Sequence, residues 1–278
     1  MTRFIFLISC LFILLSCNSS DDEAPTSNPA VLIGTNLMIN GVSGTTALTY
    51  DNNILTGFTE VFNASGSMSD REIQLEATNG VITRYTESYI DQGSGFTCYI
   101  ILNFSYDDLN RIDAITGEGD CPLNIYTIEY INDTVVFDSP LPNEDKVVKM
   151  NQDGRIVYYE YKNLILDMEY ENGNLISKTR NSSRTINYSY DSKVNPYRTD
   201  AFLNFGKIQE YIKIMKGTNV LMEDLDDYRN VNNLVSRTST HSDLGIDDLS
   251  YSYEYHSNNL PDKRFRSVGN GVTQYLYE

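Results

Sequence analysis

Histidine is scarce in this sequence, with His241 and His256 the only two among 278 residues. A zinc centre needs several closely spaced His, Cys or acidic ligands, and a hydrolytic triad needs a histidine beside its nucleophile. His241 lies in a polar stretch and His256 follows a tyrosine-rich strand at a turn, and neither has such partners close by in the sequence. We therefore expect two surface histidines, no metal site and no cofactor.

Basic residues are also few, since 21 Lys and Arg stand against 38 Asp and Glu, giving a formal net charge of −17. Nucleic acid is disfavoured as a partner because its phosphates would be repelled. The acidic clusters at 107–108, 223–227 and 247–248 lack the alternating spacing of a calcium loop. Turn chemistry explains most of them, because Asp hydrogen-bonds its own backbone in tight turns.

A long apolar run is missing beyond residue 15. The start, Met1-Thr2-Arg3 followed by the apolar run 4–15, is typical of a secretory signal peptide. An uncleaved membrane anchor would need about 20 apolar residues. Leu14-Leu15-Ser16-Cys17 resembles the lipobox of bacterial lipoproteins, which implies removal of residues 1–16 and lipidation of Cys17. The mature chain would then have 262 of the 278 residues.

The residues after Cys17 predict where the protein is held. Ser20, Asp21, Asp22 and Glu23 resemble the surface-export signal of Bacteroidetes lipoproteins, and the alternative is an ordinary acidic linker. We expect residues 17–30 to form a lipidated, flexible linker and residues 31–278 to form a single β domain. Acyl chains would anchor the protein at the outer membrane, with display on the cell surface favoured over the periplasmic leaflet.

Cysteine is nearly absent from the predicted domain, which contains only Cys98 and Cys121. Export to an oxidising compartment makes a disulfide the expected state. The segments 99–106 and 111–116 are predicted to form the two arms of a hairpin that turns near residues 108–109. The residue numbers of two residues that face each other across this hairpin then add up to about 217–218. The sum for Cys98 and Cys121 is 219, so they should lie nearly opposite each other. Two inert buried thiols are the alternative.

A repeated unit runs along most of the chain. The clearest copy is Ile156–Lys178, where alternating residues lead into Asn172-Gly173, the strongest short-range signal of a β-hairpin. An aromatic or apolar residue precedes each polar turn, and from Tyr106 onward the spacings are 24, 20, 20 and 20 residues. These marker residues are Tyr50, Tyr106, Tyr130, Met150, Tyr170 and Tyr190. A period near 20 residues is the length of one hairpin and predicts stacked hairpin repeats.

The alternation also predicts which face is buried. Tyrosines and aliphatic residues share one side of each strand, and charged or small polar residues share the other. This pattern is typical of an antiparallel sheet that is solvated on one side. We therefore predict an all-β fold, an antiparallel meander of hairpins about 20 residues long, forming a curved sheet or a barrel-like sheet.

One segment departs from the strand pattern. Asn195-Pro196-Tyr197 ends the hairpin series, and apolar residues then recur every three or four positions, as in a helix. The stripe consists of Phe202, Phe205, Ile208, Ile212 and Met215. We predict a short helical insert near 200–228 that caps or plugs the apolar side of the sheet.

The repeated Tyr-x-Tyr-Asp/Glu and Asn-Gly-Asn-Leu elements resemble the YD repeats of RHS and teneurin-like proteins, most clearly at 168–178, 188–194 and 251–260. The ensemble is also similar to a family of uncharacterised Bacteroidetes lipoproteins with a porin-like, meandering β-fold. The likeness covers roughly residues 45–278. It implies the fold and supplies no catalytic residue.

The function favoured by these patterns is that of a binding or structural module, expected to be monomeric, with a glycan or protein as its possible ligand. Tyrosines can stack on sugars, and the candidates are Tyr159, Tyr161, Tyr188, Tyr251 and Tyr253. The alternation favours the other interpretation, that they form the packing face of the sheet. A glycan-active hydrolase with paired carboxylates is the alternative function. A membrane-spanning barrel is disfavoured, because charged residues stand on many of the polar faces.

Overall fold

The computed structural model describes residues 30–278 except 53, 65–66, 93, 121–125, 133, 140–143, 217–228 and 241–247. The chain divides into two units, 1–30 and 31–278, and the description below concerns the second. The predicted signal peptide, the lipidated Cys17 and the export residues 20–23 lie outside the described residues. Among the helices described, none has both the length and the apolar character required to cross a membrane.

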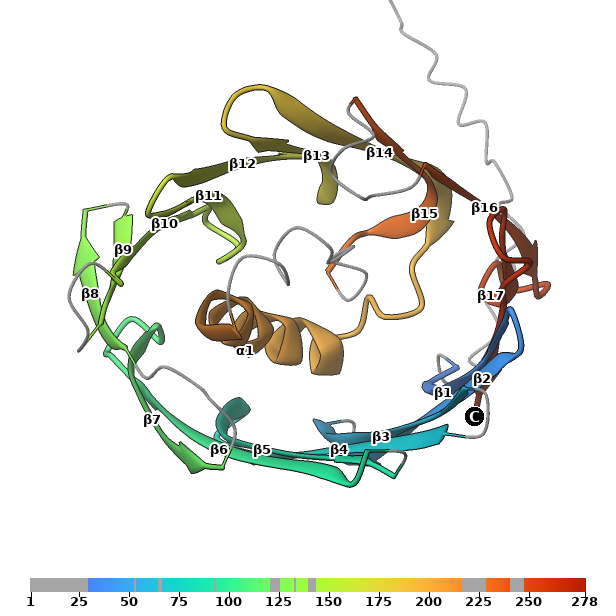
Figure 1. Ribbon diagram of the computed structural model, residues 1–278, viewed down its shortest axis with the longest axis horizontal. Helices are drawn as coiled ribbons and strands as arrows, with labels where there is room; N and C mark the ends of the chain where they lie inside the picture. Colours follow the sequence, from blue (N-terminus) through green and yellow to red (C-terminus); the bar gives the residue numbers. More distant parts are fainter. Residues whose placement is uncertain are drawn as a thin grey trace, which may run out of the picture. The chain divides into compact units, whose positions relative to one another are not determined.

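Residues 31–278 form a closed antiparallel β-barrel of 18 strands, in which each strand pairs with its neighbours in sequence and β1 pairs with β18 (Figure 1). The strands are β1 Leu32–Ile39, β2 Val42–Asp51, β3 Ile54–Ala64, β4 Ser67–Thr78, β5 Val81–Asp91, β6 Phe96–Tyr106, β7 Ile112–Gly119, β8 Thr127–Ile131, β9 Thr134–Asp138, β10 Lys146–Met150, β11 Ile156–Tyr161, β12 Leu164–Glu171, β13 Asn174–Arg180, β14 Arg184–Val194, β15 Asn232–Ser239, β16 Leu249–Tyr255, β17 Pro261–Arg266 and β18 Val272–Tyr277. The predicted all-β meander is confirmed, and the sheet closes on itself.

The predicted hairpin at Asn172-Gly173 is also confirmed. Asn172 has φ 50° and Gly173 has φ 77°, the two positive values that a type I′ turn requires. Glu171 pairs with Asn174 across the turn, and β12 and β13 form the two arms. The sequence alone was therefore sufficient to place this unit.

The barrel is apolar inside and polar outside. Leu166, Met168, Ile186 and Tyr188 are buried on the inner face, while the residues between them in sequence point outward. Exposed charged and polar residues occupy outward mid-strand positions around the ring, namely Glu72, Gln74, Glu76, Asn103, Thr116, Glu118, Glu129, Lys149, Glu169, Asn187, Ser189, Ser252 and Glu254. A membrane-spanning barrel has the opposite arrangement, with an apolar band facing lipid.

The repeat tyrosines have a structural role that the sequence did not reveal. Within the described ranges, seven tyrosine hydroxyls donate hydrogen bonds of 2.5–2.9 Å to a backbone carbonyl of the preceding strand. The donor and acceptor pairs are Tyr50 and Leu32, Tyr106 and Ile82, Tyr130 and Ile112, Tyr170 and Ile156, Tyr190 and Leu175, Tyr253 and Leu234, and Tyr277 and Pro261. We call these contacts the tyrosine staples.

Each staple acceptor lies at a β-bulge, where the strand register shifts. Examples are Ile112 opposite Tyr106 and Leu175 opposite Tyr170. A bulge leaves a backbone group without its ladder partner, so the tyrosine hydroxyl satisfies a carbonyl that would otherwise be orphaned. The staples join pairs such as β11–β12 and β13–β14, whose connecting turns lie at the other end of the barrel. They therefore fasten the end that carries the β2–β3, β4–β5, β6–β7, β8–β9, β10–β11 and β12–β13 turns, which we call the turn rim.

The predicted helix is α1, Asp200–Lys216, and it lies inside the barrel (Figure 1). All five residues of the apolar stripe are buried: Phe202, Phe205, Ile208, Ile212 and Met215. The ring of Phe205 meets that of Phe58 on β3 edge to face, with centroids 5.4 Å apart. The prediction of a plug is confirmed for residues 200–216, and residues 217–228 lie outside the described residues.

Lys146 holds the end of the plug against the wall. Its buried ammonium group donates a hydrogen bond to the carbonyl of Ile214, in the last turn of α1, and lies 4.5 Å from the ring centroid of Tyr126. Carbonyls of a last helical turn have no intrahelical donor, and a cation there also suits the helix dipole. Burial lowers the pKa of Lys146 to about 8.

The hairpin of β6 and β7 has the register on which the disulfide prediction depends. The residue numbers of paired residues add up to 219, as in Ile100 opposite Gly119 and Leu102 opposite Gly117. The residue numbers of Cys98 and Cys121 have the same sum. Cys121 itself lies outside the described residues. The disulfide therefore stays a prediction.

Candidate functional site

A pocket of about 870 Å³ opens at the turn rim, between the hairpin turns and the plug helix. The turns of β6–β7, β8–β9 and β10–β11 contribute Asn110, Asn132 and Asn151, and α1 contributes Asn204 and Lys207. Small-molecule sites commonly have volumes of about 300–1,000 Å³. We call this cavity the rim pocket.

Among the described residues, five cationic side chains and a single carboxylate line the rim pocket. The cations are Arg111, Arg155, Arg198, Lys207 and Arg229, and the carboxylate belongs to Asp153. The protein as a whole carries a net charge of −17. A cluster of one sign in a concave, low-dielectric site concentrates the local potential, so the pocket is a positive site on an acidic protein.

Two of these arginines occupy equivalent positions in two equivalent turns. Asp107 donates its backbone N–H to the carbonyl of Arg111, and Asn151 does the same to Arg155, each at 2.9 Å. Each guanidinium then stacks on the staple tyrosine of the following hairpin. The Cζ of Arg111 lies 4.0 Å from the ring centroid of Tyr130, and that of Arg155 lies 4.0 Å from the ring centroid of Tyr170.

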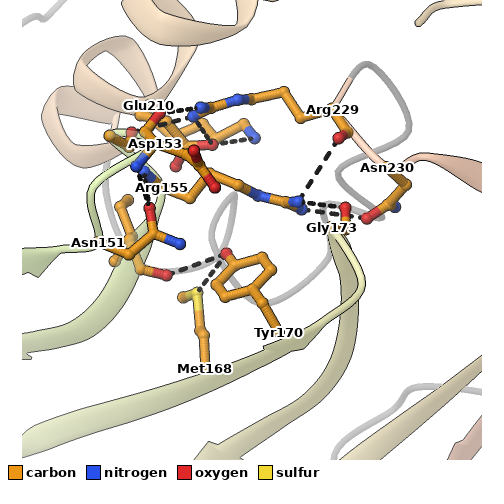
Figure 2. A network of polar contacts seen from close by, with 12 residues as sticks. Asn151, Asp153, Arg155, Met168, Tyr170, Gly173, Glu210, Arg229 and Asn230 are labelled. Atoms are coloured by element: carbon orange, nitrogen blue, oxygen red, sulfur yellow. Dashed lines mark hydrogen bonds and ion pairs between the residues drawn. The ribbon is translucent and has the colours of Figure 1, made fainter. Parts of the chain in front are cut away.

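The environments of these two arginines differ. Arg111 is exposed and forms a 2.6 Å ion pair with Asp107, and this hydrogen-bonded contact raises the pKa of Arg111 and lowers that of Asp107. Arg155 is buried and donates to the carbonyl of Gly173 at 2.7 Å and to Oδ1 of Asn230 at 3.0 Å (Figure 2). Arg155 therefore forms part of the pocket floor, whereas Arg111 lies on its wall.

Arg229 reaches the pocket across the surface of α1 at Gly206. A Cβ at position 206 would lie 2.6 Å from Cγ of Arg229, so only glycine leaves room for this side chain. Arg229 donates to the carbonyls of Gly154 and Asp153, and its Nη1 lies 3.6 Å from Oε1 of Glu210 (Figure 2). The contacts connect the plug helix to the β10–β11 turn. Gly206, which weakens the helical pattern in the sequence, is thus explained by packing.

The remaining two cations are exposed. Arg198 donates to the carbonyl of Arg229 at 3.3 Å, and Lys207 projects from an exposed position of α1. Within the described part of the chain, neither has a carboxylate within 4 Å. Their charges are therefore available to a ligand at lower cost than those of the paired arginines.

Part of the lining of the rim pocket is apolar and aromatic. It includes Leu109, Val135, Met150, Tyr130 and Tyr211. The hydroxyls of Tyr130 and Tyr211 are 2.8 Å apart, and burial raises the pKa of both. Both stay neutral at physiological pH, so this part of the lining offers apolar area and uncharged hydroxyl groups.

The structure places the predicted stacking tyrosines away from the rim pocket. Tyr159 and Tyr188 are buried in the core, with 0% and 6% of their surface exposed, and Tyr161 and Tyr251 pack against that core. Tyr253 is half-buried and stacks on Tyr255 with ring centroids 5.7 Å apart. The packing interpretation therefore describes Tyr159 and Tyr188.

The other predicted features lie elsewhere or were not described. His256 is at the surface, with Nε2 3.8 Å from Oδ1 of Asp262, and His241 lies outside the described residues. No group of three or more His, Cys, Asp or Glu side chains suited to a metal ion occurs in the described ranges. The acidic cluster at 223–227 also lies outside these ranges.

Sequence reasoning missed all five pocket cations. They are spread over more than a hundred residues, and only barrel closure and the plug bring them together. One signal was present, because Arg111 and Arg155 each stand four residues after the first polar residue of a turn. That spacing indicates a shared turn geometry, and it could have identified two of the five.

No protein-family model matches the chain, and no curated protein matches it. Among solved structures, it is similar to the crystal structure of a porin-like protein from Bacteroides uniformis. The two sequences are 12% identical and the TM-score is 0.46, with the match covering 91% of this chain and 99% of the other.

Proposed function

We propose that the protein is a lipid-anchored β-barrel of the outer membrane, displayed on the cell surface, which binds a small ligand in the rim pocket. The observation that carries the binding role is the rim pocket itself, a cavity of about 870 Å³ with both cationic and apolar walls. Pockets with an apolar lining and a few convergent polar groups are the usual form of ligand sites.

Two features support a barrel that is anchored at the membrane rather than embedded in it. The outer face carries charged side chains at mid-strand, including Glu72, Glu169 and Glu254, which lipid would not solvate. The sequence 14–17 with its lipobox-like pattern supplies an anchor that needs no spanning strand. We expect Cys17→Ala to release the protein from the membrane fraction, and continued pelleting with membranes would refute the anchor.

The alternative of a hydrolase with paired carboxylates gains no support from the rim pocket. Asp153 is the single carboxylate among the described residues that line it. Both stereochemical classes of glycoside hydrolysis require two carboxyl groups flanking the bond to be broken. A binding module therefore remains the better interpretation of this site.

The binding role can be tested with a variant that fills the pocket. Met150 occupies a position where most other hairpins have tyrosine, so Met150→Tyr should fold while reducing the cavity. A glycan and small-molecule screen of the purified full chain would provide ligands, and Met150→Tyr should weaken their binding about tenfold or more. Thr116→Tyr, which adds the same ring at an exposed site on the outer face, is the matched control. Ligands that bind Met150→Tyr as tightly as the original protein would refute the pocket as the site.

A further inference from the structure

We propose that the ligand of the rim pocket is a small molecule that carries an oxyanion, a carboxylate or a phosphate, on an apolar or ring-bearing body. This inference rests on the proposed function, because it names the ligand class of the same pocket. The cation-rich lining gives the charge of the ligand, and the apolar wall gives the character of its body.

Two of the lining cations have no carboxylate partner among the residues that the structure describes. Among the five lining cations, Arg111 has Asp107 as its partner, and Arg229 shares Glu210 with Lys213. Arg198 and Lys207 have no such carboxylate among the described residues. A ligand oxyanion would therefore meet two cations, Arg198 and Lys207, that no described carboxylate pairs.

Buried Arg155 is held in a fixed orientation at the rim pocket. Arg155 is fixed by the carbonyl of Gly173, by the amide of Asn230 and by the ring of Tyr170. These contacts orient the guanidinium in the lining of the cavity. Preorganised donors of this kind favour anion binding, because little side-chain entropy is lost when the ligand arrives.

The apolar part of the lining favours a ligand that is larger than a hydrated inorganic ion. Leu109, Val135 and Met150 present apolar surface, and the hydroxyls of Tyr130 and Tyr211 bond to each other. A free inorganic ion would leave this part of the lining in contact with water. The anionic end of a ligand can contact the lining cations, and an apolar or ring-shaped body can contact the apolar lining residues. Burying that body adds to the affinity.

Two sources could supply this chemistry, a dissolved metabolite and a lipid headgroup. The two sources are distinguished by experiment.

The test measures the binding of matched probes to the full chain in detergent micelles by calorimetry. Phenyl phosphate and benzoate carry the oxyanion, and benzyl alcohol is their neutral counterpart. We expect at least one anion to bind about tenfold or more tightly than the alcohol, with affinity falling as salt is raised. Lys207→Gln and Arg198→Gln should each weaken the anion about threefold to tenfold and leave the alcohol unchanged. Lys149→Gln, an exposed lysine on the outer face, is the matched control and should change neither.

The outcomes separate this inference from the proposed function. If benzyl alcohol binds as tightly as both anions and Met150→Tyr weakens its binding, the inference of an anionic ligand is wrong. The rim pocket is then still a binding site. Failure of both anions to bind would also overturn the inference, whereas the broader ligand screen decides the function. To distinguish a dissolved ligand from a lipid headgroup, the binding of phenyl phosphate is measured with the full chain reconstituted in phosphatidylcholine vesicles, with or without phosphatidylglycerol. Weaker phenyl phosphate binding in the anionic vesicles supports a headgroup as ligand, and unchanged binding supports a dissolved one.

Discussion

Replacing one staple tyrosine by phenylalanine tests whether the repeat exists to close the turn rim. Tyr50 is the best position, because it lies outside the rim pocket and its hydroxyl donates to the carbonyl of Leu32 at 2.7 Å. Tyr50→Phe removes one oxygen atom and leaves the ring in place. The carbonyl of Leu32 then loses its donor in a residue of which only 1% is exposed.

The expected cost follows from the burial of that carbonyl. A typical intramolecular hydrogen bond contributes about 0.5–1.5 kcal/mol net, and a buried acceptor left unsatisfied costs about 1–3 kcal/mol. Because Tyr50 is only half-buried and water can approach from its side, we expect the lower part of that range, about 1–2 kcal/mol. For a domain of this size that corresponds to a fall in Tm of roughly 2–8 °C.

The assay is denaturant unfolding of the full chain followed by tyrosine fluorescence and far-UV circular dichroism. Tyr158→Phe is the control, since the hydroxyl of Tyr158 bonds the carboxylate of Glu160 on the outer face and no described backbone carbonyl. That change should shift the free energy of unfolding by less than about 0.5 kcal/mol. If Tyr50→Phe costs no more than Tyr158→Phe, the staples do not stabilise the rim and our explanation of the repeat is wrong.

Three further predictions concern pH, the plug and the disulfide. Burial raises the pKa of Tyr50 to about 12 from 10.0. The protonated hydroxyl therefore stabilises the fold fully below pH 10, and this stabilisation is lost as the pH rises towards 12. The free energy of unfolding should fall over that window by less than about 1.4 kcal/mol per pH unit, because the ring is partly solvated. A slope in urea titrations that is equally steep in Tyr50→Phe would contradict this. Gly206→Ala would normally stabilise a helix by up to about 1 kcal/mol, but here it displaces Arg229, so we expect a loss of about 1–3 kcal/mol in thermal unfolding; a gain would disprove the packing argument. Cys98 and Cys121 should appear as one bridged peptide in non-reducing mass spectrometry, with free thiols as the opposing result, and reduction should cost about 3 kcal/mol.

The sequence was sufficient for the local structure because each hairpin encodes itself. The alternation and the Asn172-Gly173 turn act over neighbouring residues, and the stripe from Phe202 to Met215 follows helical spacing within one segment. Closure is different in kind, since β1 and β18 are separated by more than two hundred residues and no local pattern announces their pairing. A curved sheet and a barrel therefore looked equivalent from the sequence.

The tyrosines show where a correct pattern supported an incomplete explanation. Their alternation placed them on the buried face, which the burial of Tyr159 and Tyr188 confirms. Tyr106 and Tyr190 are tyrosine rather than phenylalanine because the hydroxyl donates a hydrogen bond to a backbone carbonyl on another strand. A bulge leaves that carbonyl without its partner in the sheet. A bulge is a property of two paired strands, so a reading of single segments could not find it.

The same logic connects the repeat to the rim pocket. The β8–β9 hairpin keeps an unbroken register, unlike the bulged hairpins on either side, and so presents no bulged carbonyl for a staple. The position that would supply that staple holds Met150, and Met150, Val135 and Asn132 all line the cavity. In a barrel of similar hairpins, the residues that stabilise the barrel are expected to recur in each hairpin. A binding site is expected where a hairpin lacks such a residue. The rim pocket lies where the repeat departs from its own rule, between the two turns that carry Arg111 and Arg155, and that coincidence is the strongest reason to regard it as a site that serves a ligand rather than the fold.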